Sequence, residues 1–283
     1  MTRSATAGRV GEALAAATDA LTAAGVESAR LDAELLLARA TGWERETLAA
    51  EPEREVGASA ARRFGELIRR RLRREPVAYI LGCKGFRGIQ VSVDSRALIP
   101  RPETELLVDV ALEVGPRTAL DVGTGSGAIA LALADELPDC EVTATDTSLE
   151  ALDLARENAD RLELADRVRF ARGTVPDRER FDLVLANLPY VSETEFGSLA
   201  PEIAEHEPRG AVVSGPDGLE AINVVAPAAT AALEPGGSLA LEVGVGQAGA
   251  VGELLLDLGY RQVEGRLDLA GIPRVVLGRI DGA

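Results

Sequence analysis

An amide, a proline and a phenol directly follow an apolar run in the stretch VLANLPYV, residues 184–191. The run predicts a buried strand, after which Asn187, Leu188, Pro189 and Tyr190 leave the sheet as a turn. Such a turn often serves only as a strand cap, because Asn suits turns and Pro ends strand pairing. It could also do chemistry, since the Asn187 side-chain oxygen and the Leu188 carbonyl can accept two N–H groups of one nitrogen. The surroundings of the turn decide between these two interpretations.

A glycine-rich loop follows an earlier strand, in DVGTGSGAIALALA. We expect the cofactor-binding loop to comprise Gly123, Thr124, Gly125, Ser126 and Gly127. Glycines let the backbone approach a ligand without Cβ collisions. The dinucleotide fingerprint would place its third glycine at Ala128. Here Asp121 precedes the loop instead, and Asp146 ends the next strand, where a carboxylate can accept hydrogen bonds from both ribose hydroxyls. The pattern favours S-adenosylmethionine over NAD and predicts a class I methyltransferase domain.

The elements that position these residues alternate between strand and helix from about residue 103 onward, which is typical of a parallel sheet. Apolar runs predict strands at 118–122, 141–145, 167–171, 181–186 and 238–243. Helical spacing recurs at about 102–113, 127–136, 148–160, 219–233 and 247–258. Segments 260–268 and 273–280 then predict an antiparallel hairpin. We therefore expect a doubly wound, Rossmann-like α/β domain whose mostly parallel sheet ends in that hairpin. Ligands of such sheets bind at the carboxyl ends of the strands, near the point where the strand order reverses.

The first quarter of the chain is predicted to be a small helical domain. Helical spacing occurs at 8–25, 29–41 and 60–74, and Thr41 is expected to cap the start of a further helix. Glycines and alternating polarity at 83–100 predict a hairpin. We therefore expect three parts. They are a helical substrate-recognition domain at 1–76, a hairpin linker at 77–98 and a methyltransferase domain at 99–283.

Nearly the whole chain resembles the release-factor glutamine methyltransferases, the HemK/PrmC family. The resemblance rests on the segments ALIPRPETELLVDVAL, LDVGTGSGAIALALA, NLPYV, HEPRGAVVSGPDGL and LEVGVGQ. It implies methyl transfer from S-adenosylmethionine to the side-chain amide nitrogen of the glutamine in the Gly-Gly-Gln loop of peptide-chain release factors. It also implies that Arg101, within IPRPETE, belongs to the cofactor site together with Asn187.

The resemblance explains the turn chemically. An amide nitrogen is a poor nucleophile because its lone pair is delocalised, and two accepted N–H bonds would fix it and favour the charge that develops on it. Tyr190 is expected to lie against the amide face while Pro189 holds the turn rigid. Because a sulfonium is already activated, alignment should supply most of the catalysis, and no general base is required to start the transfer.

Two positions depart from the family pattern. The family motif is Asn-Pro-Pro-Tyr, and Leu188 replaces its first proline, which removes a fixed φ but keeps the backbone carbonyl. Thr174 and Val175, which we place beside the adenine, replace an acidic residue and an aromatic one. Alternatives therefore stay open: a divergent paralogue that methylates another amide or a small metabolite, a DNA adenine N6-methyltransferase that grips a flipped base, or a non-catalytic scaffold.

Composition limits the partners. The chain of 283 residues is 46% hydrophobic with a formal net charge of −16, which argues against broad nucleic-acid binding. The Arg-rich segment 61–76 is an exception that could be a solvated face or a docking surface. Cys83 and Cys140 lack ligand spacing and His206 is the only histidine, so we expect no metal site and a reducing, cytoplasmic location. No signal peptide or membrane segment is evident, and we expect a monomer that acts on a protein substrate.

Overall fold

The computed structural model describes residues 6–282 and divides into two compact units. The first comprises the chain up to Gly82 together with Pro201–His206, and the second comprises Cys83–Ala200 and Glu207 onward. Within the described residues, no helix is both long enough and apolar enough to cross a membrane.

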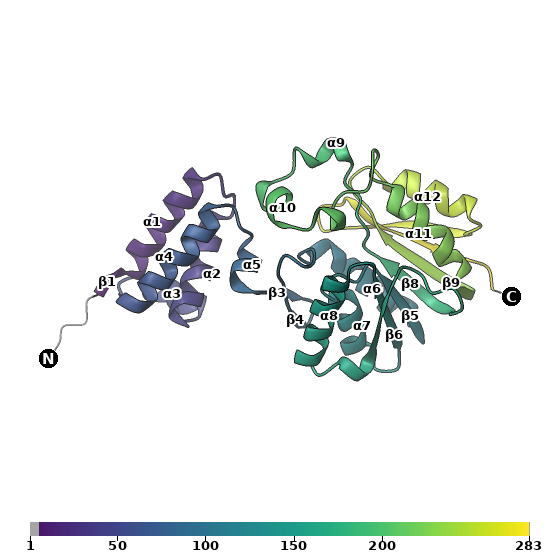
Figure 1. The fold of residues 1–283 in the computed structure, drawn as a ribbon, viewed down its shortest axis with the longest axis horizontal. Coiled ribbons are helices and arrows are strands. Elements are labelled where there is room, and N and C mark those ends of the chain that lie inside the picture. The colour runs from purple at the N-terminus through teal and green to yellow at the C-terminus, as the bar shows by residue number, and fades with distance from the viewer. Residues whose placement is uncertain (1–5, 283) are drawn as a thin grey trace. The chain divides into compact units, whose positions relative to one another are not determined.

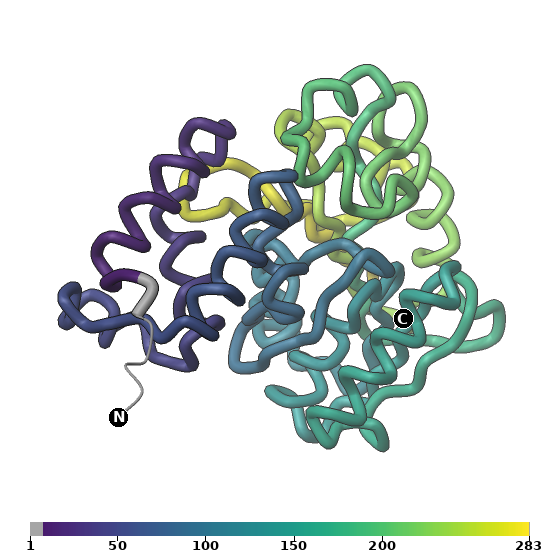
Figure 2. The backbone as a smooth tube through the Cα atoms, turned by 60° about the vertical axis from the view of Figure 1, so that its left-hand side comes forward, coloured from purple at the N-terminus to yellow at the C-terminus, as the bar shows by residue number. Residues whose placement is uncertain are grey.

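The first unit is a helical bundle, as predicted (Figures 1 and 2). Its elements are β1 (Thr6–Arg9), α1 (Val10–Ala23), α2 (Ala29–Thr41), α3 (Arg45–Ala50), β2 (Glu55–Gly57), α4 (Ala58–Leu72), α5 (Val77–Leu81) and α10 (Pro201–His206). β1 pairs antiparallel with β2. Leu14 and Leu21 of α1 and Leu36 and Leu37 of α2 are fully buried at the helical spacing that predicted them.

The expected cap at Thr41 was wrong. Thr41 ends α2, and its hydroxyl donates to the Leu37 carbonyl at 2.8 Å, while Gly42 follows in the left-handed conformation. The next helix begins at Arg45 with Glu44 at its N-cap position. Gly after a periodic stretch is a helix stop, and this signal outweighs the capping preference of Thr here.

Two arginines of the Arg-rich segment are used inside the first unit. Arg71 is 4% exposed and pairs with Asp32 at 2.6 Å, which neutralises its buried charge. Arg71 and Arg74 both bind the carboxylate of Glu202 on α10, each with a contact of 2.6 Å. Part of the Arg-rich segment therefore binds α10, which is distant in sequence, through ion pairs and does not face solvent.

The second unit is the predicted doubly wound α/β domain. Its main sheet comprises β5 (Thr118–Val122), β6 (Glu141–Asp146), β7 (Val168–Arg172), β8 (Phe181–Ala186), β9 (Leu233–Glu242), β10 (Gln262–Leu267) and β11 (Pro273–Arg279). Their spatial order is β10-β11-β9-β8-β5-β6-β7. Neighbours from β9 to β7 run parallel, and β10 and β11 form the expected antiparallel end. β3 (Cys83–Phe86) and β4 (Ile89–Ser92) form the predicted hairpin.

Helices cover both faces of this sheet, among them α7 (Ala128–Glu136), α8 (Leu149–Arg161), α11 (Glu220–Ala231) and α12 (Ala248–Asp257) (Figure 1). The other helices of the second unit are η1 (Pro102–Thr104), α6 (Glu105–Val114), η2 (Ala165–Arg167), α9 (Glu193–Phe196) and η3 (Arg209–Ala211). Leu120 and Val122 of β5 pack into the core formed with α11 and α12. The alternate side chain, Asp121, faces α7, where it accepts the Ala130 N–H.

The strand order reverses at β5, which lies between β6 and β8. The loops that leave β5, β6 and β8 therefore meet at one edge of the sheet. These loops begin with the glycine-rich segment, Asp146 and Asn187, so the fold brings together the three features singled out in the sequence.

Candidate functional site

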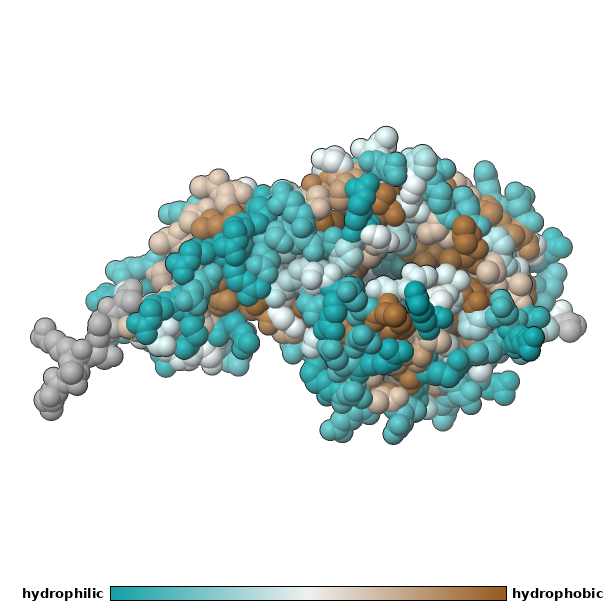
Figure 3. Space-filling model, viewed as in Figure 1, coloured by the Kyte–Doolittle hydropathy of each residue, from teal (hydrophilic) through white to brown (hydrophobic). Residues whose placement is uncertain are grey.

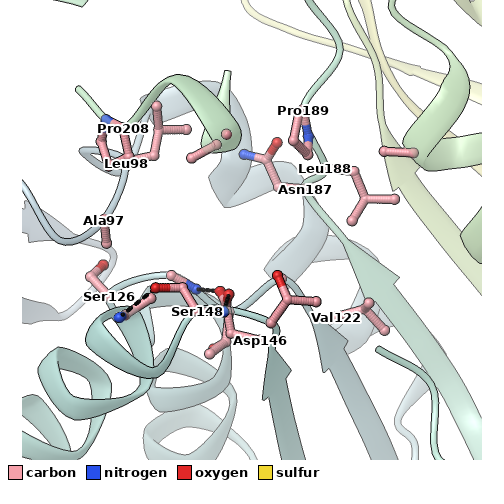
Figure 4. A pocket seen from close by; sticks show the side chains of 18 of the residues that line it. Ala97, Leu98, Val122, Ser126, Asp146, Ser148, Asn187, Leu188, Pro189 and Pro208 are labelled. Atoms are coloured by element: carbon pink, nitrogen blue, oxygen red, sulfur yellow. Dashed lines mark hydrogen bonds between the residues drawn. The ribbon is translucent and has the colours of Figure 1, made fainter. Parts of the chain in front are cut away.

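A cavity of about 690 Å³ opens at this edge, entirely within the second unit. Its size lies in the range of small-molecule sites, about 300–1,000 Å³. Figure 3 shows a hollow in this part of the molecule, bordered by weakly polar and apolar side chains. Asp146 and Asn187 reach toward the space from opposite sides (Figure 4).

Backbone hydrogen bonds shape the glycine loop. The N–H groups of Gly123 and Thr124 both donate to the Thr145 carbonyl, at 2.8 and 2.9 Å. Gly127 has φ +83°, and a Cβ there would lie 3.1–3.2 Å from Leu131 and Ala155. A side chain at position 127 would thus be strained and crowded. The loop is held in a single path at the start of α7, with Thr124, Gly125 and Ser126 on the cavity wall.

Asp121 is buried beneath this loop. Its Oδ2 accepts the Thr124 hydroxyl at 2.6 Å and the Ala130 N–H at 3.2 Å. Oδ1 has no hydrogen-bond partner within residues 6–282. Burial raises the pKa of this carboxyl to about 7, although its two hydrogen bonds oppose the rise. Asp121 therefore joins the loop to α7 rather than lining the cavity.

Asp146 supports the loop and faces the cavity at once. Its Oδ2 accepts the Gly125 N–H at 3.0 Å and its Oδ1 accepts the Ser148 N–H at 2.8 Å. Each carboxylate oxygen can accept a further hydrogen bond. The geometry suits a ligand with two neighbouring hydroxyls, as a ribose presents, because the carboxylate is already oriented.

The turn after β8 forms the opposite wall. Asn187 Nδ2 donates to the hydroxyl of buried Thr104 at 3.0 Å. Asn187, Leu188 and Pro189 line the cavity. Leu188 is only 7% exposed and packs into the sheet core. Its side chain also lies beside the glycine loop, 3.4 Å from where a Cβ at position 123 would be. It contributes packing as well as the backbone carbonyl considered from the sequence.

Two separate segments converge on the backbone carbonyl of Tyr190. Gln247 Nε2 donates to it at 2.9 Å, and Gln247 Oε1 accepts the Gly244 N–H at 2.9 Å. Gly218, with φ +80°, lies so close that a Cβ would be 2.3 Å from the same oxygen. Only glycine fits there. The segments GPDGL and LEVGVGQ therefore fix the end of the NLPY turn from outside.

The phenol of Tyr190 points toward a buried carboxylate. Tyr190 donates to Glu242 Oε1 at 3.5 Å, and Glu242 is 2% exposed. Burial raises the pKa of Glu242 to about 7, while the Thr104 hydroxyl and Arg274 favour its ionised form. Burial also raises the pKa of the Tyr190 phenol to about 12, so this group stays protonated and donates.

Of the remaining predicted site residues, some line the cavity and others do not. Thr174 lines the cavity, whereas Val175 lies against the sheet core and outside the lining. Arg101 forms an ion pair with buried Glu207, whose other oxygen accepts the Ile99 N–H at 3.1 Å. Arg101, Gly127 and Tyr190 also lie outside the cavity lining, so their roles there would be indirect.

Sequence reasoning did not single out four residues that hold the turn, although all lie in segments quoted for the resemblance. They are Thr104, Gly218, Glu242 and Gln247. The sequence indicated these residues only in that they lie within segments shared with the family. Their position in such a segment does not show which atoms they contact. Among the described residues, no cluster of His, Cys, Asp and Glu could hold a metal ion.

Two family models match the chain. They are the PrmC N-terminal domain over residues 12–82 and the methyltransferase small domain over residues 101–209. The release factor glutamine methyltransferase of Caulobacter vibrioides is 41% identical over 274 residues, which cover 94% of this chain and 95% of that protein. That of Koribacter versatilis is 42% identical over 266 residues, covering 92% and 94%.

Solved structures share the fold of the second unit. A methyltransferase from Pyrococcus furiosus has a TM-score of 0.54 at 22% identity, covering 70% of this chain and 92% of that one. The hMettl16 catalytic domain has a TM-score of 0.58 at 16% identity, covering 71% and 80%. These likenesses support the class I methyltransferase fold.

Proposed function

This chain belongs to the family of release factor glutamine methyltransferases, and from that premise we propose its substrate and its site. The protein transfers a methyl group from S-adenosylmethionine to the side-chain amide nitrogen of a glutamine, in the Gly-Gly-Gln loop of a peptide-chain release factor. Action on a translation factor implies a cytoplasmic location. The proposal further takes the enzyme as a monomer that needs no nucleic acid.

The residues at the cavity fit the cofactor. Asp146, already oriented by the Gly125 N–H, would hold the ribose hydroxyls, and the loop from Gly123 to Gly127 would let the ligand approach the backbone closely. Thr174, which the sequence places beside the adenine, also lines this cavity. When bound, the cofactor supplies a methyl group on a sulfonium, which is already activated for transfer.

One observation carries the assignment of the acceptor. Because Asn187 Nδ2 donates to Thr104, the Oδ1 atom is the end of this amide that can accept a hydrogen bond from a ligand. A substrate amide nitrogen offers N–H groups, and Asn187 Oδ1 accepts one while the Leu188 carbonyl accepts the other. These two acceptors would fix the position of the nitrogen for attack on the methyl group and would favour the positive charge that develops on it.

A mass-spectrometric assay tests this function. The protein is incubated with isotopically labelled S-adenosylmethionine and a purified release factor, and the label is located by peptide mapping. We expect one methyl group on the glutamine of the Gly-Gly-Gln loop and none on a variant with Ala at that position. Label on another residue, on a metabolite or on DNA would assign the chain to a different acceptor.

The first unit is assigned to substrate recognition. Arg62 and Arg69 on α4 are exposed, in contrast to the ion-paired Arg71. Replacing both by Glu should raise KM for the release factor severalfold and leave cofactor affinity unchanged, because charge reversal acts on the protein encounter. Equal KM values for the variant and the parent protein would exclude a role for this face.

A further inference from the structure

A row of hydrogen-bonding side chains runs from the cavity wall, where Asn187 and Thr104 lie, to Glu242, which does not line the cavity. It begins at Asn187, whose Nδ2 donates to Thr104 Oγ1 at 3.0 Å. It ends at Glu242, which accepts the Tyr190 phenol at 3.5 Å. Thr104 and Glu242 are 3% and 2% exposed. Water therefore has little access to these two groups, and both depend on other protein groups for their hydrogen bonds.

Two groups in this row of side chains have no assigned hydrogen-bond partner among the described residues, namely the hydroxyl hydrogen of Thr104 and Oε2 of Glu242. A hydroxyl has one hydrogen, and Thr104 Oγ1 already accepts from Asn187, so its hydrogen remains to be donated. Glu242 Oε2 is buried and has no hydrogen-bond partner within the described part of the chain. The Thr104 hydroxyl is close enough to favour the ionised form of Glu242. A buried acceptor without a donor is costly, which favours joining the two groups.

On the basis of the proposed function, we infer that Glu242 is a positioning residue that sets the orientation of the Asn187 amide through Thr104. When Glu242 is ionised, above its pKa of about 7, its carboxylate only accepts hydrogen bonds, so Thr104 must donate to it. The Thr104 oxygen is then an acceptor toward Asn187, which turns Nδ2 inward and Oδ1 to the substrate. Glu242 touches neither the substrate nor the cofactor in this arrangement.

The reverse arrangement explains why the carboxylate matters. A group that donates at position 242 would turn the Thr104 hydroxyl hydrogen toward Asn187. The Asn187 amide would then flip and present its NH₂ group to the substrate. An NH₂ group facing the N–H bonds of a glutamine leaves donors opposed to donors, which misaligns the nitrogen. A substrate with glutamate in place of that glutamine would instead be bound, because its carboxylate accepts hydrogen bonds from the NH₂ group.

Isosteric variants separate this role from a merely structural one. Glu242→Gln keeps the shape but introduces a donor, and Thr104→Val keeps the shape but removes the hydroxyl, whereas Thr104→Ser retains it. At pH 8, where Glu242 is ionised, we expect kcat on the release factor to fall about 10²-fold in the first two variants, as for one misplaced preorganised group. Thr104→Ser should keep most of the activity, and cofactor affinity should stay within twofold in all three. Glu234→Gln, on the exposed part of the same strand, is the matched control.

Discrimination between substrates gives a readout that packing alone would not change. Two release factors are compared as ligands of the enzyme: the natural form, whose loop carries Gln, and a variant whose loop carries Glu. We measure the KM of the Gln form and the inhibition constant of the Glu form. The ratio of the inhibition constant to KM should be at least tenfold lower for the enzyme variant Glu242→Gln than for the parent enzyme. If the parent methylates the Gln form while Glu242→Gln and Thr104→Val keep more than half its kcat, the inference is wrong although the function stands. A parent protein without any activity on the release factor refutes the proposed function instead.

A spectroscopic measurement tests the orientation without any turnover. The chain has three asparagines, Asn158, Asn187 and Asn223, so [¹⁵N]Asn labelling gives few side-chain amide signals. The Asn187 signal is identified by its loss in Asn187→Asp. We expect slowed hydrogen exchange at Asn187 Nδ2 in the parent, and faster exchange in Glu242→Gln and Thr104→Val. Unchanged exchange in both variants would overturn the inference.

Discussion

The close approach of Gly218 to the Tyr190 carbonyl predicts a large effect from one added methyl group. In Gly218→Ala the new Cβ would lie 2.3 Å from that oxygen and 2.9 Å from Gln247 Nε2. Carbon–oxygen contacts are normally no shorter than about 3.3 Å, so one partner must move by about 1 Å. The Tyr190 oxygen belongs to backbone and cannot rotate away. Displacing the NLPY turn by this amount should lower kcat about 100-fold, because reacting groups tolerate little misplacement.

A second glycine separates this collision from backbone strain. Alanine at φ +80° costs about 1–2 kcal/mol wherever it occurs. Gly271 has φ +76° and no atom within 4 Å of its Cβ position, so Gly271→Ala carries the strain without the contact. Single-turnover methylation of a release factor is measured for both variants, with cofactor affinity from calorimetry. Retention of a third of the parent rate by Gly218→Ala, or an equal loss of rate in Gly271→Ala, would refute the collision with the Tyr190 carbonyl as the cause.

Three further predictions concern Asn187, Asp146 and the buried carboxyl of Glu242. Asn187→Ala should lower kcat about 10²–10³-fold. Asn187→Asp should bind the cofactor yet turn over poorly, because the new carboxylate charge would lie near the sulfonium. Single-turnover rates near the parent value would contradict both expectations. Asp146→Ala should weaken cofactor binding by about 1.5–3 kcal/mol in calorimetry, and NAD should not bind; unchanged affinity would reject the ribose contact. The pKa of Glu242 rises from 4.5 unfolded to about 7 folded. The native state therefore holds the extra proton, and the free energy of unfolding falls as pH rises through this window, by about 3 kcal/mol. Thermal melts should show Glu242→Gln to be more stable than the parent at pH 8 and equal to it at pH 4.5, and a parent that is more stable at pH 8 would reverse the sign.

The arrangement of the sheet could be predicted because its signals are local and repeated. Apolar runs separated by helical spacing fix a parallel α/β order, and that order brings the ends of β5, β6 and β8 to one edge. The same strand order placed the glycine loop and Asp146 at this edge, where both line the cavity. The failure at Thr41 is equally local, because a helix stop and a helix start compete over residues 41–45. Gly42 decides the competition through its left-handed conformation.

The support of the turn could not be predicted, because it depends on distances between segments far apart in sequence. Gly218 and Gln247 both meet the Tyr190 carbonyl, yet neither differs in type from ordinary turn residues. Glu242 looked like the polar end of a strand, and only the packing around it shows that it is buried behind the site. A resemblance to a family marked these segments without saying what they touch.

The same support explains how the motif accommodates Leu188 in place of a proline. Proline would restrict one φ angle of the turn through its ring. Here the end of the turn is held from outside, since Gln247 donates to the Tyr190 carbonyl and Val191 exchanges backbone hydrogen bonds with Val212 and Ser214 at 3.0 and 2.9 Å. Its beginning is held by the Asn187–Thr104 hydrogen bond and by the buried Leu188 side chain. A leucine supplies apolar area that fills the space against the core, and burying such a side chain contributes about 1.5–3 kcal/mol. Tertiary contacts thus replace the rigidity that the missing ring would have supplied, and the backbone carbonyl at position 188 is retained, as its proposed role in binding the acceptor nitrogen requires.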